Sequence, residues 1–427
     1  MTEMASQLVE IEKPVYGGDF LARVEGKAVF VPLALPGEKA RVRVVADKRG
    51  YATAEIEEIV AASMGRVAPK CRHFGTCGGC NYQHANYETQ LKWKQAILRE
   101  TLERGGVRVE QEIGVLAGDP WGYRNRIRMA FDAAANPGYR GRRSHAVIAI
   151  GECPIAAPLL IDAAKAFAEV SRRIAPALRP TEIALFCNAD ESALLASIFV
   201  ARAGKVRLDA IADALKEQIP ALAGMELVVE GDKRQQTRTV ATWGASSINY
   251  HAAGFDYRVD HGAFFQVNRW LVDALVERVT AGRKGRLAWD MFAGVGSFAR
   301  RLAATFERVI AVESAPAAIT GLESNLKGTA GSAVRAAAHE FLRRGGKGET
   351  PELIVVDPPR TGLGAEATTL LAATGADAIV YVSCDPATLA RDLRGLTGAG
   401  YRIEAITLCD LFPQTFHLET VVELRRV

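Results

Sequence analysis

A chain of 427 residues with a formal net charge of +4 is too long for one ordinary hydrophobic core, so two or three domains are expected. Its composition, 49% hydrophobic and 24% charged, is typical of a globular protein and excludes a disordered chain. The sequence has no apolar run of about eighteen residues and no secretory signal at its acidic N-terminus. We therefore expect a cytoplasmic protein with no membrane partner, in which thiols stay reduced.

Residues 8–60 predict a small all-β unit. Strand-like runs such as Val29-Phe-Val-Pro and Lys39-Ala-Arg-Val-Arg-Val-Val alternate with turn signals such as Gly17-Gly18 and Pro36-Gly37. About five short strands in such a segment suggest an OB-like barrel, a fold that often binds nucleic acid.

Three of the seven cysteines lie within the ten residues CRHFGTCGGC, as Cys71, Cys77 and Cys80. Clustered thiols in a reducing compartment indicate a metal site or catalysis rather than a disulfide. Three thiols leave open where a fourth ligand would come from. Residues 85–105 then show helical periodicity that ends at Gly105-Gly106.

An arginine-rich segment runs from Trp121 to His145. It holds six arginines and only one acid, Asp132, and it includes Tyr123, Phe131 and Tyr139. Arginine interleaved with aromatic residues suits phosphate contact and base stacking, which indicates RNA or DNA as a partner. The alternative is a solvated strand face.

From about residue 262 to the end, apolar strands alternate with helical stretches. The strands begin at Leu287, Arg308, Leu353 and Ala378. This rhythm predicts a doubly wound, mostly parallel sheet. Ligands of such sheets bind outside the carboxyl ends of the strands.

Two of these strand ends suit a nucleoside-containing cofactor. Asp290-Met-Phe-Ala-Gly-Val-Gly follows a strand and opens a helix, and its glycines, Gly294 and Gly296, permit a tight turn close to a ligand. Glu313 ends the next strand, where a carboxylate can accept hydrogen bonds from ribose hydroxyls. A dinucleotide is less favoured because no GxGxxG cradle is present, and the spacing fits S-adenosylmethionine. The alternative is a plain glycine turn and a surface glutamate.

The next two strand ends carry Asp357-Pro-Pro-Arg and Cys384. A thiol at the mouth of the crevice can act as a nucleophile, whereas a structural cysteine would more often lie within a strand. Near the C-terminus, His417 and Glu419 are two residues apart and would share one face of an extended segment. The alternative is a surface pair beside the last strand.

In this order along the chain, the motifs resemble those of the RNA 5-methyluridine methyltransferases. The matching stretches are AFFQVN at 263–268, DMFAGVG at 290–296, DPPR at 357–360, SCDPATLARDL at 383–393 and HLETV at 417–421. The resemblance implies that the Cys384 thiolate adds to carbon 6 of uracil and that Glu419 then removes the proton from carbon 5. It implies Phe264 as a contact of the flipped base. The residues implied for the S-adenosylmethionine and target-base pocket are Gln266, Asp290, Phe292, Gly294, Gly296, Glu313 and Asp357.

The resemblance also suggests the missing ligand of the cysteine cluster. The spacing Cys71-x5-Cys77-x2-Cys80 is similar to the cluster motif of the ribosomal-RNA branch, and Cys153 matches the position of the fourth ligand. Four thiolates would hold a [4Fe-4S] cluster, with zinc as the alternative. We expect the cluster to order the arginine-rich segment rather than to undergo redox turnover. The arginines expected to contact RNA are Arg124, Arg126 and Arg140.

The expected fold is α/β, with a Rossmann-like class I methyltransferase domain at residues 85–114 and 258–427. An N-terminal OB-like TRAM β-barrel occupies residues 1–62, and an α+β central domain carrying the metal cluster occupies residues 63–84 and 115–257. Joint presence of barrel and cluster motif favours 23S ribosomal RNA as the target, by analogy. The alternatives are a tRNA uracil-C5-methyltransferase and a non-catalytic RNA-binding or redox-sensing module. The resemblance implies a monomer with no obligate protein partner.

Overall fold

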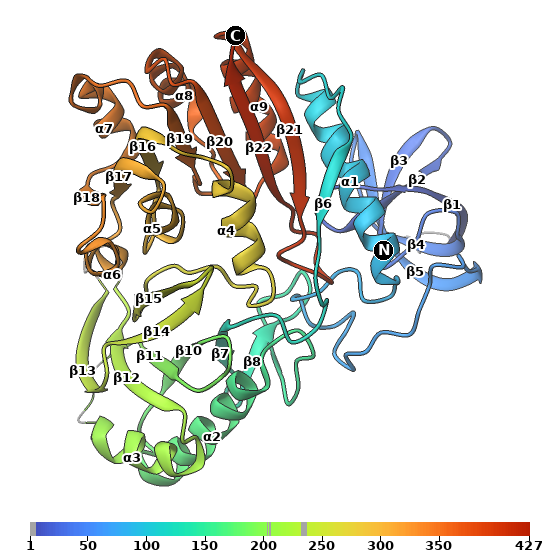
Figure 1. Cartoon of the computed structure of the whole chain (residues 1–427). Helices are drawn as coiled ribbons and strands as arrows, with labels where there is room; N and C mark the ends of the chain where they lie inside the picture. Colours follow the sequence, from blue (N-terminus) through green and yellow to red (C-terminus); the bar gives the residue numbers. More distant parts are fainter. Residues whose placement is uncertain (1–5, 203, 205, 232–236) are drawn as a thin grey trace.

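The computed structural model describes residues 6–427 except 203, 205 and 232–236 (Figure 1). These residues form a closed five-stranded barrel and sheets of seven, two and eight strands. Residues 1–5 of the predicted barrel range lie outside the described residues. No helix in the described part of the chain is long and apolar enough to cross a membrane.

The predicted N-terminal barrel is present and has five strands. Their order around the barrel is β1-β2-β3-β5-β4. The strands are β1 (Ser6–Pro14), β2 (Asp19–Val24), β3 (Lys27–Pro32), β4 (Lys39–Asp47) and β5 (Tyr51–Ala61). Trp93 of helix α1 (Tyr87–Arg104) packs edge-on against the fully buried Phe20 of β2, with ring centroids 5.0 Å apart. The barrel core is therefore closed by a helix from outside the barrel.

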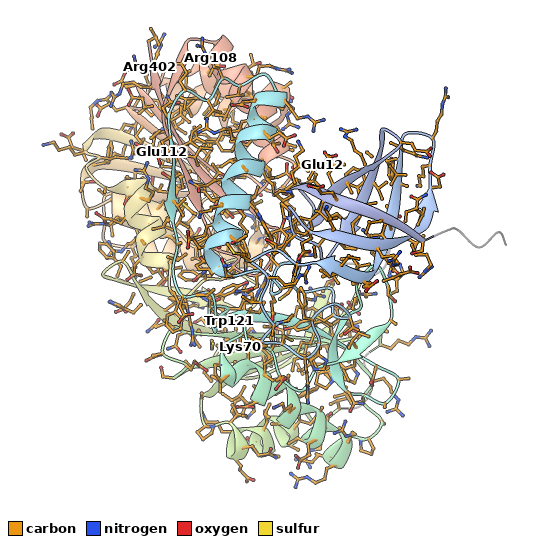
Figure 2. All side chains as sticks on the ribbon, turned by 90° about the vertical axis from the view of Figure 1, so that its right-hand side faces the viewer. Glu12, Lys70, Arg108, Glu112, Trp121 and Arg402 are labelled. Atoms are coloured by element: carbon orange, nitrogen blue, oxygen red, sulfur yellow. The ribbon has the colours of Figure 1, made fainter. Side chains whose placement is uncertain are left out.

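The segment that connects the barrel to α1 crosses to the central region. The ammonium group of Lys70 lies 4.8 Å from the ring centroid of Trp121, and Figure 2 shows the two residues together below helix α1. The indole N–H of Trp270 donates to the carbonyl oxygen of Trp121 at 2.9 Å. These contacts hold the connecting segment close to the start of the arginine-rich stretch.

The central region is built on a seven-stranded sheet in the order β13-β12-β11-β10-β7-β8-β9. Helices α2 (Pro158–Ile174) and α3 (Leu208–Gln218) cover one face, where Phe167 and Ile211 are fully buried. The strands are β7 (Arg126–Phe131), β8 (Pro137–Arg140), β9 (Val147–Ala149), β10 (Pro180–Cys187), β11 (Leu194–Val200), β12 (Leu222–Val229) and β13 (Arg238–Gly244).

The C-terminal region is the predicted doubly wound sheet, in the order β18-β17-β16-β19-β20-β22-β21-β6. The neighbours from β18 to β20 are parallel, and β22 runs antiparallel between β20 and β21. The strands are β6 (Ile113–Leu116), β16 (Gly285–Met291), β17 (Phe306–Glu313), β18 (Gly331–Arg335), β19 (Leu353–Val356), β20 (Ala378–Ser383), β21 (Tyr401–Cys409) and β22 (Glu419–Arg426).

Helices cover both faces of this sheet (Figure 1). One layer contains α1 and the helices α7 (Ala338–Arg343), α8 (Gly364–Ala373) and α9 (Pro386–Gly398). The other contains α4 (Val272–Thr280), α5 (Ser297–Leu302) and α6 (Pro316–Leu326). A short 3₁₀ helix, η1 (Gly345–Gly348), follows α7.

Two early segments belong to this C-terminal sheet by packing. Helix α1 packs against α9, and β6 pairs in parallel with β21. The hairpin of β14 (Ser247–Ala252) and β15 (Phe255–Asp260) packs against α6, so the predicted limit between residues 257 and 258 falls inside β15. The domain limits given above stay a prediction.

Candidate active site

A cavity of about 600 Å³ opens at the carboxyl ends of β16, β17, β19 and β20. It brings together residues from the loop before α4, from four strand ends and from the last loop of the chain. The sequence-predicted residues in its lining are Phe264, Gln266, Phe292, Gly294, Glu313, Asp357, Cys384 and Glu419. Asp290, Gly296, Arg124, Arg126 and Arg140 do not line it.

The loop after β16 bends sharply toward this cavity. Phe292, Gly294 and Gly296 all have positive φ angles, of 65°, 56° and 92°. Such angles are easy for glycine and strained for phenylalanine, and strain of this kind is typical of ligand-binding loops. A carboxylate oxygen of Glu313 accepts a hydrogen bond from the Gly294 N–H at 2.8 Å, which fixes the loop.

Asp290 lies behind this loop rather than in the cavity. It is fully buried, and one carboxyl oxygen accepts a hydrogen bond from the Ala299 N–H at 2.8 Å. Burial, with the charges of Asp357 and Glu313 adding to it, raises the pKa of Asp290 to about 8. Asp290 therefore joins the loop to helix α5, while Glu313 faces the ligand space.

Cys384 stands at the carboxyl end of β20, immediately before helix α9. Asp385 caps that helix, since its carboxylate accepts hydrogen bonds from the N–H groups of Ala387 and Thr388 at 3.0 and 2.9 Å. Burial raises the pKa of the Cys384 thiol to about 12, and the charges of Glu419 and Asp357 act in the same direction. Arg360 acts in the opposite direction.

Glu419 begins β22 and is only 6% exposed. Burial, followed by the charge of Asp357, raises its pKa well above the usual value, and Arg360 opposes this effect. Burial also raises the pKa of Asp357 to about 7. The cavity thus holds one thiol and two carboxyl groups that keep their protons to unusually high pH, with one arginine beside them.

His417, the other member of the predicted pair, is a neutral imidazole in this environment. Burial lowers its pKa to about 4, and the charge of Arg360 contributes further. An Arg360 nitrogen lies 3.4 Å from Nδ1 of His417. Because burial raises the pKa of Glu419 and lowers that of His417, the Glu419 carboxylate is the stronger proton acceptor of the two.

The barrel also contacts this site, although no sequence pattern predicts such a contact. The Tyr16 hydroxyl, in the turn between β1 and β2, donates a hydrogen bond to the Asp385 carboxylate at 3.1 Å. The Tyr16 ring meets Phe416 edge-on, with centroids 5.8 Å apart. Tyr16 and Asp385 are 369 positions apart, and no local pattern marks such a contact.

The four predicted ligand cysteines line a second cavity, of about 360 Å³. Cys71, Cys77 and Cys80 come from the loop before α1, and Cys153 comes from the loop before α2. Burial raises the pKa of Cys80 to about 12. In the described ranges, no three histidine, cysteine or carboxylate side chains are close enough together to hold a single metal ion.

The three arginines predicted to contact RNA have different surroundings. Arg124 is enclosed between the rings of Tyr123 and Phe412, at 5.7 and 5.8 Å, and its Nε has no hydrogen-bond partner in the described structure. Arg126 donates to the Ala263 carbonyl oxygen at 2.6 Å. Only Arg140 is exposed. Arg124 and Arg126 are therefore half-buried and held by contacts within the protein, a difference from Arg140 that charge patterning along the sequence does not reveal.

Two sequence families match the chain. Residues 347–427 match the family described as tRNA (Uracil-5-)-methyltransferase, and residues 2–56 match the TRAM domain. An uncharacterized RNA methyltransferase of Aquifex aeolicus is 33% identical, with 97% of each chain covered. The 23S rRNA (uracil(1939)-C(5))-methyltransferase RlmD of Halomonas elongata is 31% identical, with 97% of this chain and 88% of the relative covered.

The chain belongs to the RNA uracil-C5-methyltransferase family. It is an S-adenosylmethionine-dependent enzyme of this family, and its barrel corresponds to the TRAM match. The solved structure of Pyrococcus abyssi tRNA (uracil-54, C5)-methyltransferase with S-adenosyl-L-homocysteine aligns with a TM-score of 0.77 and 25% identity. It covers 97% of this chain and 100% of that one, so the similarity extends over barrel, central region and catalytic sheet alike.

Proposed function

We propose that this enzyme forms 5-methyluridine in 23S ribosomal RNA through a covalent adduct between Cys384 and carbon 6 of the target uracil. The observation that carries the proposal is the convergence of Cys384 and Glu419 on one cavity, from strands β20 and β22. Carbon 5 of uracil is a weak nucleophile, and its methylation needs both a thiolate and a base.

The chemistry assigns one step to each side chain. The Cys384 thiolate forms a bond to carbon 6, and the electrons of the carbon 5–carbon 6 double bond move toward carbon 5. When bound, S-adenosylmethionine would supply the methyl group that carbon 5 takes; its sulfonium–methyl bond would break, leaving S-adenosylhomocysteine. Glu419 then removes the carbon 5 proton, the double bond forms again, and the Cys384 thiolate leaves.

The electrostatics of the cavity suit these roles. Arg360 favours the thiolate against the burial that raises the pKa of Cys384. The raised pKa of Glu419 makes its carboxylate a stronger base than an exposed glutamate. Phe264 is 57% exposed at the cavity, an apolar ring that a flipped base would cover by stacking.

The cofactor contacts follow from the lining of the cavity. The Glu313 carboxylate lines the cavity and would accept hydrogen bonds from the ribose hydroxyls, and the lack of a side chain at Gly294 would permit close approach of the cofactor. Asp290 and Gly296 act by shaping the loop, since neither lines the cavity. The residues proposed to hold S-adenosylmethionine are Gln266, Phe292, Gly294, Glu313 and Asp357.

We further propose that the four-cysteine cavity holds a [4Fe-4S] cluster on Cys71, Cys77, Cys80 and Cys153. Four thiolates suit a four-iron core, and zinc on the same four thiolates is the alternative, which metal analysis of the purified protein separates. The unpartnered Nε of Arg124 borders the same cavity, where an anionic cluster would offset its charge.

Two RNA targets have support. The 23S rRNA proposal rests on relatives such as the Halomonas enzyme, at 31% identity. A tRNA target is supported by the similarity to the Pyrococcus tRNA methyltransferase. Because that similarity extends over the whole chain, the shared architecture does not by itself favour ribosomal RNA. A non-catalytic module is disfavoured because both Cys384 and Glu419 are present in one cavity. We propose a cytoplasmic, monomeric enzyme, as the family resemblance implies.

The test is tritium release from RNA labelled at uracil carbon 5, with ribosomal and transfer RNA as separate substrates. Release that requires S-adenosylmethionine and Cys384 supports the mechanism, and the RNA that responds identifies the target. Methyl incorporation without tritium release would move the reaction to another atom and remove the role of Glu419.

A further inference from the structure

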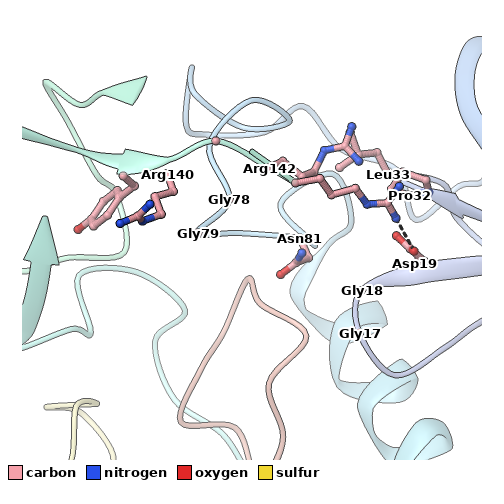
Figure 3. A pocket seen from close by; sticks show the side chains of 13 residues that line it. Gly17, Gly18, Asp19, Pro32, Leu33, Gly78, Gly79, Asn81, Arg140 and Arg142 are labelled. Carbon is pink, nitrogen blue, oxygen red and sulfur yellow. Dashed lines mark hydrogen bonds and ion pairs between the residues drawn. The ribbon is translucent and has the colours of Figure 1, made fainter. Parts of the chain in front are cut away.

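A third cavity, of about 470 Å³, lies where the barrel, the cysteine loop and the segment after β8 meet (Figure 3). We call it the barrel–loop pocket. Figure 3 shows Gly78, Gly79 and Asn81 between Arg140 and the barrel residues Asp19 and Leu33. Its lining residues are Gly17, Gly18, Asp19, Pro32, Leu33, Gly78, Gly79, Asn81, Tyr139, Arg140, Gly141, Arg142 and Arg143.

The barrel–loop pocket is cationic. Its lining holds three arginines, and Asp19 is the one acidic side chain among these described residues. Asp19 pairs with Arg143 at 2.7 Å, which leaves the charges of Arg140 and Arg142 uncompensated within the lining. Arg140 is exposed, and Nη1 of Arg142 has no hydrogen-bond partner in the described structure. The pocket therefore has two guanidinium groups without a carboxylate partner in its lining: that of the exposed Arg140, and that of the half-buried Arg142, whose unpartnered Nη1 is itself buried.

The cysteine loop holds these arginines in place. The Gly78 N–H donates to the Arg140 carbonyl oxygen at 3.0 Å, and the Arg142 N–H donates to the Thr76 carbonyl oxygen at 2.8 Å. Nε of Arg142 also donates to the Gly75 carbonyl oxygen at 3.2 Å. A Cβ atom at Gly78 would lie 3.0 Å from the Arg140 carbonyl oxygen, so any larger residue there would push the two segments slightly apart. The guanidinium of Arg142 is thus set before any ligand arrives.

The position of the pocket connects it to the active site. It shares Gly78, Gly79 and Tyr139 with the four-cysteine cavity, which in turn shares His417 with the active-site cavity. The three cavities therefore adjoin one another from the barrel to Cys384.

We propose that the barrel–loop pocket binds a phosphodiester group of the RNA strand that carries the target uridine, through Arg140 and Arg142. This inference rests on the proposed function for its ligand class. Fixed guanidinium groups match phosphate oxygens in geometry and charge. Backbone contacts of this kind position a strand without reading its sequence.

The test is the salt dependence of RNA binding by an Arg140→Gln/Arg142→Gln variant. For a single strand, each phosphate contact contributes about −0.7 to the slope of log K against log salt. Losing two contacts should therefore make the slope of the double variant less steep by about 1.4. At 0.15 M salt this corresponds to binding weakened by roughly tenfold.

The matched control is Arg108→Gln/Arg402→Gln, which removes the same charge. These side chains are 88% and 70% exposed, and Figure 2 shows them at the far end of the molecule from Lys70.

Because Arg140 is exposed, the single change Arg140→Gln should not disturb the fold, and it should make the salt-dependence slope less steep by about 0.7. A double variant with the slope and affinity of the control would overturn the proposal. If the wild-type protein methylated no RNA, the proposed function would be contradicted instead. The two failures can be told apart, because the salt dependence of RNA binding can be measured without methylation.

A second inference rests on the contact between barrel and nucleophile loop. Tyr16 donates to Asp385, the residue after Cys384, and its ring packs on Phe416. Phe416 packs in turn on His417, with ring centroids 4.3 Å apart. One barrel side chain thus contacts both the loop that carries the nucleophile and the loop that leads to Glu419. We infer that Tyr16 is a positioning residue for Cys384.

The test is Tyr16→Phe, which removes the hydroxyl and keeps the ring contact with Phe416. Loss of one hydrogen bond that holds the loop should lower kcat by roughly fivefold, with KM for RNA and S-adenosylmethionine affinity unchanged. Tyr51→Phe, on an exposed barrel tyrosine, is the control and should leave kcat unchanged. An unaltered kcat in Tyr16→Phe, or a rise in KM alone, would refute the positioning role.

Discussion

Replacing Glu419 by glutamine should separate methyl transfer from product release. Glutamine has nearly the same shape, so the Cys384 adduct and the methylation step remain possible, but the neutral amide does not accept the carbon 5 proton. General-base removal costs about 10²- to 10⁴-fold in rate. Asp357 lines the same cavity, with a pKa raised to about 7 by burial, and can remove the proton less effectively. We therefore expect a loss of turnover near 10²-fold.

The assay combines methyl incorporation with detection of covalent complexes after denaturation. Glu419→Gln should incorporate about one methyl group per enzyme in a burst and then stall with the RNA still attached to protein. Glu423→Gln, on the same strand but outside the cavity, should turn over without trapping RNA. Steady turnover of Glu419→Gln within about threefold of the wild type, without trapped RNA, would show that another group removes the proton.

Three further changes test other parts of the site. Cys384→Ala should abolish RNA adducts and methylation while S-adenosylmethionine binding, measured by calorimetry, is kept; residual adducts would point to another nucleophile. Cys153→Ser should lower the iron content of anaerobically purified protein, and full iron retention would remove Cys153 from the ligand set. For Asp290 the pKa is about 8 when folded and about 4 when unfolded, so unfolding releases a proton between these values and stability falls as pH rises from about 4 to about 8. Asp290→Asn should flatten the fall in melting temperature across this window, and parallel curves for the two proteins would contradict the raised pKa.

The eight-stranded sheet and the active-site cavity could be predicted, because several candidate active-site residues follow an apolar strand in the sequence. Glu313, Asp357 and Cys384 come at or directly after the ends of β17, β19 and β20, and parallel strands present their carboxyl ends at one edge. The barrel was predictable for a similar reason, since its alternating strands and glycine turns are local signals.

Other features depend on contacts that no local pattern reveals. From the sequence alone, Arg124 is expected on the surface. In the structure, its guanidinium packs against the ring of Phe412, almost three hundred positions later in the chain. Asp290 has the expected motif position but points behind the loop, because it bonds to the Ala299 N–H in the next helix. In both cases the residue type was visible in the sequence, and the direction of the side chain was set by tertiary packing.

The loop that leads to Glu419 is held mainly by the N-terminal half of the chain. Nζ of Lys94, on α1, lies 2.6 Å from the Asp410 carboxylate, with both side chains fully buried, and it also donates to the Phe412 carbonyl oxygen at 2.9 Å. Burying two charges is costly, and leaving either one alone costs about 3–5 kcal/mol. Such a pair contributes a defined geometry more than net stability. Tyr16 from the barrel also contacts this loop through Phe416, so residues of both the barrel and α1 hold the loop that leads to Glu419.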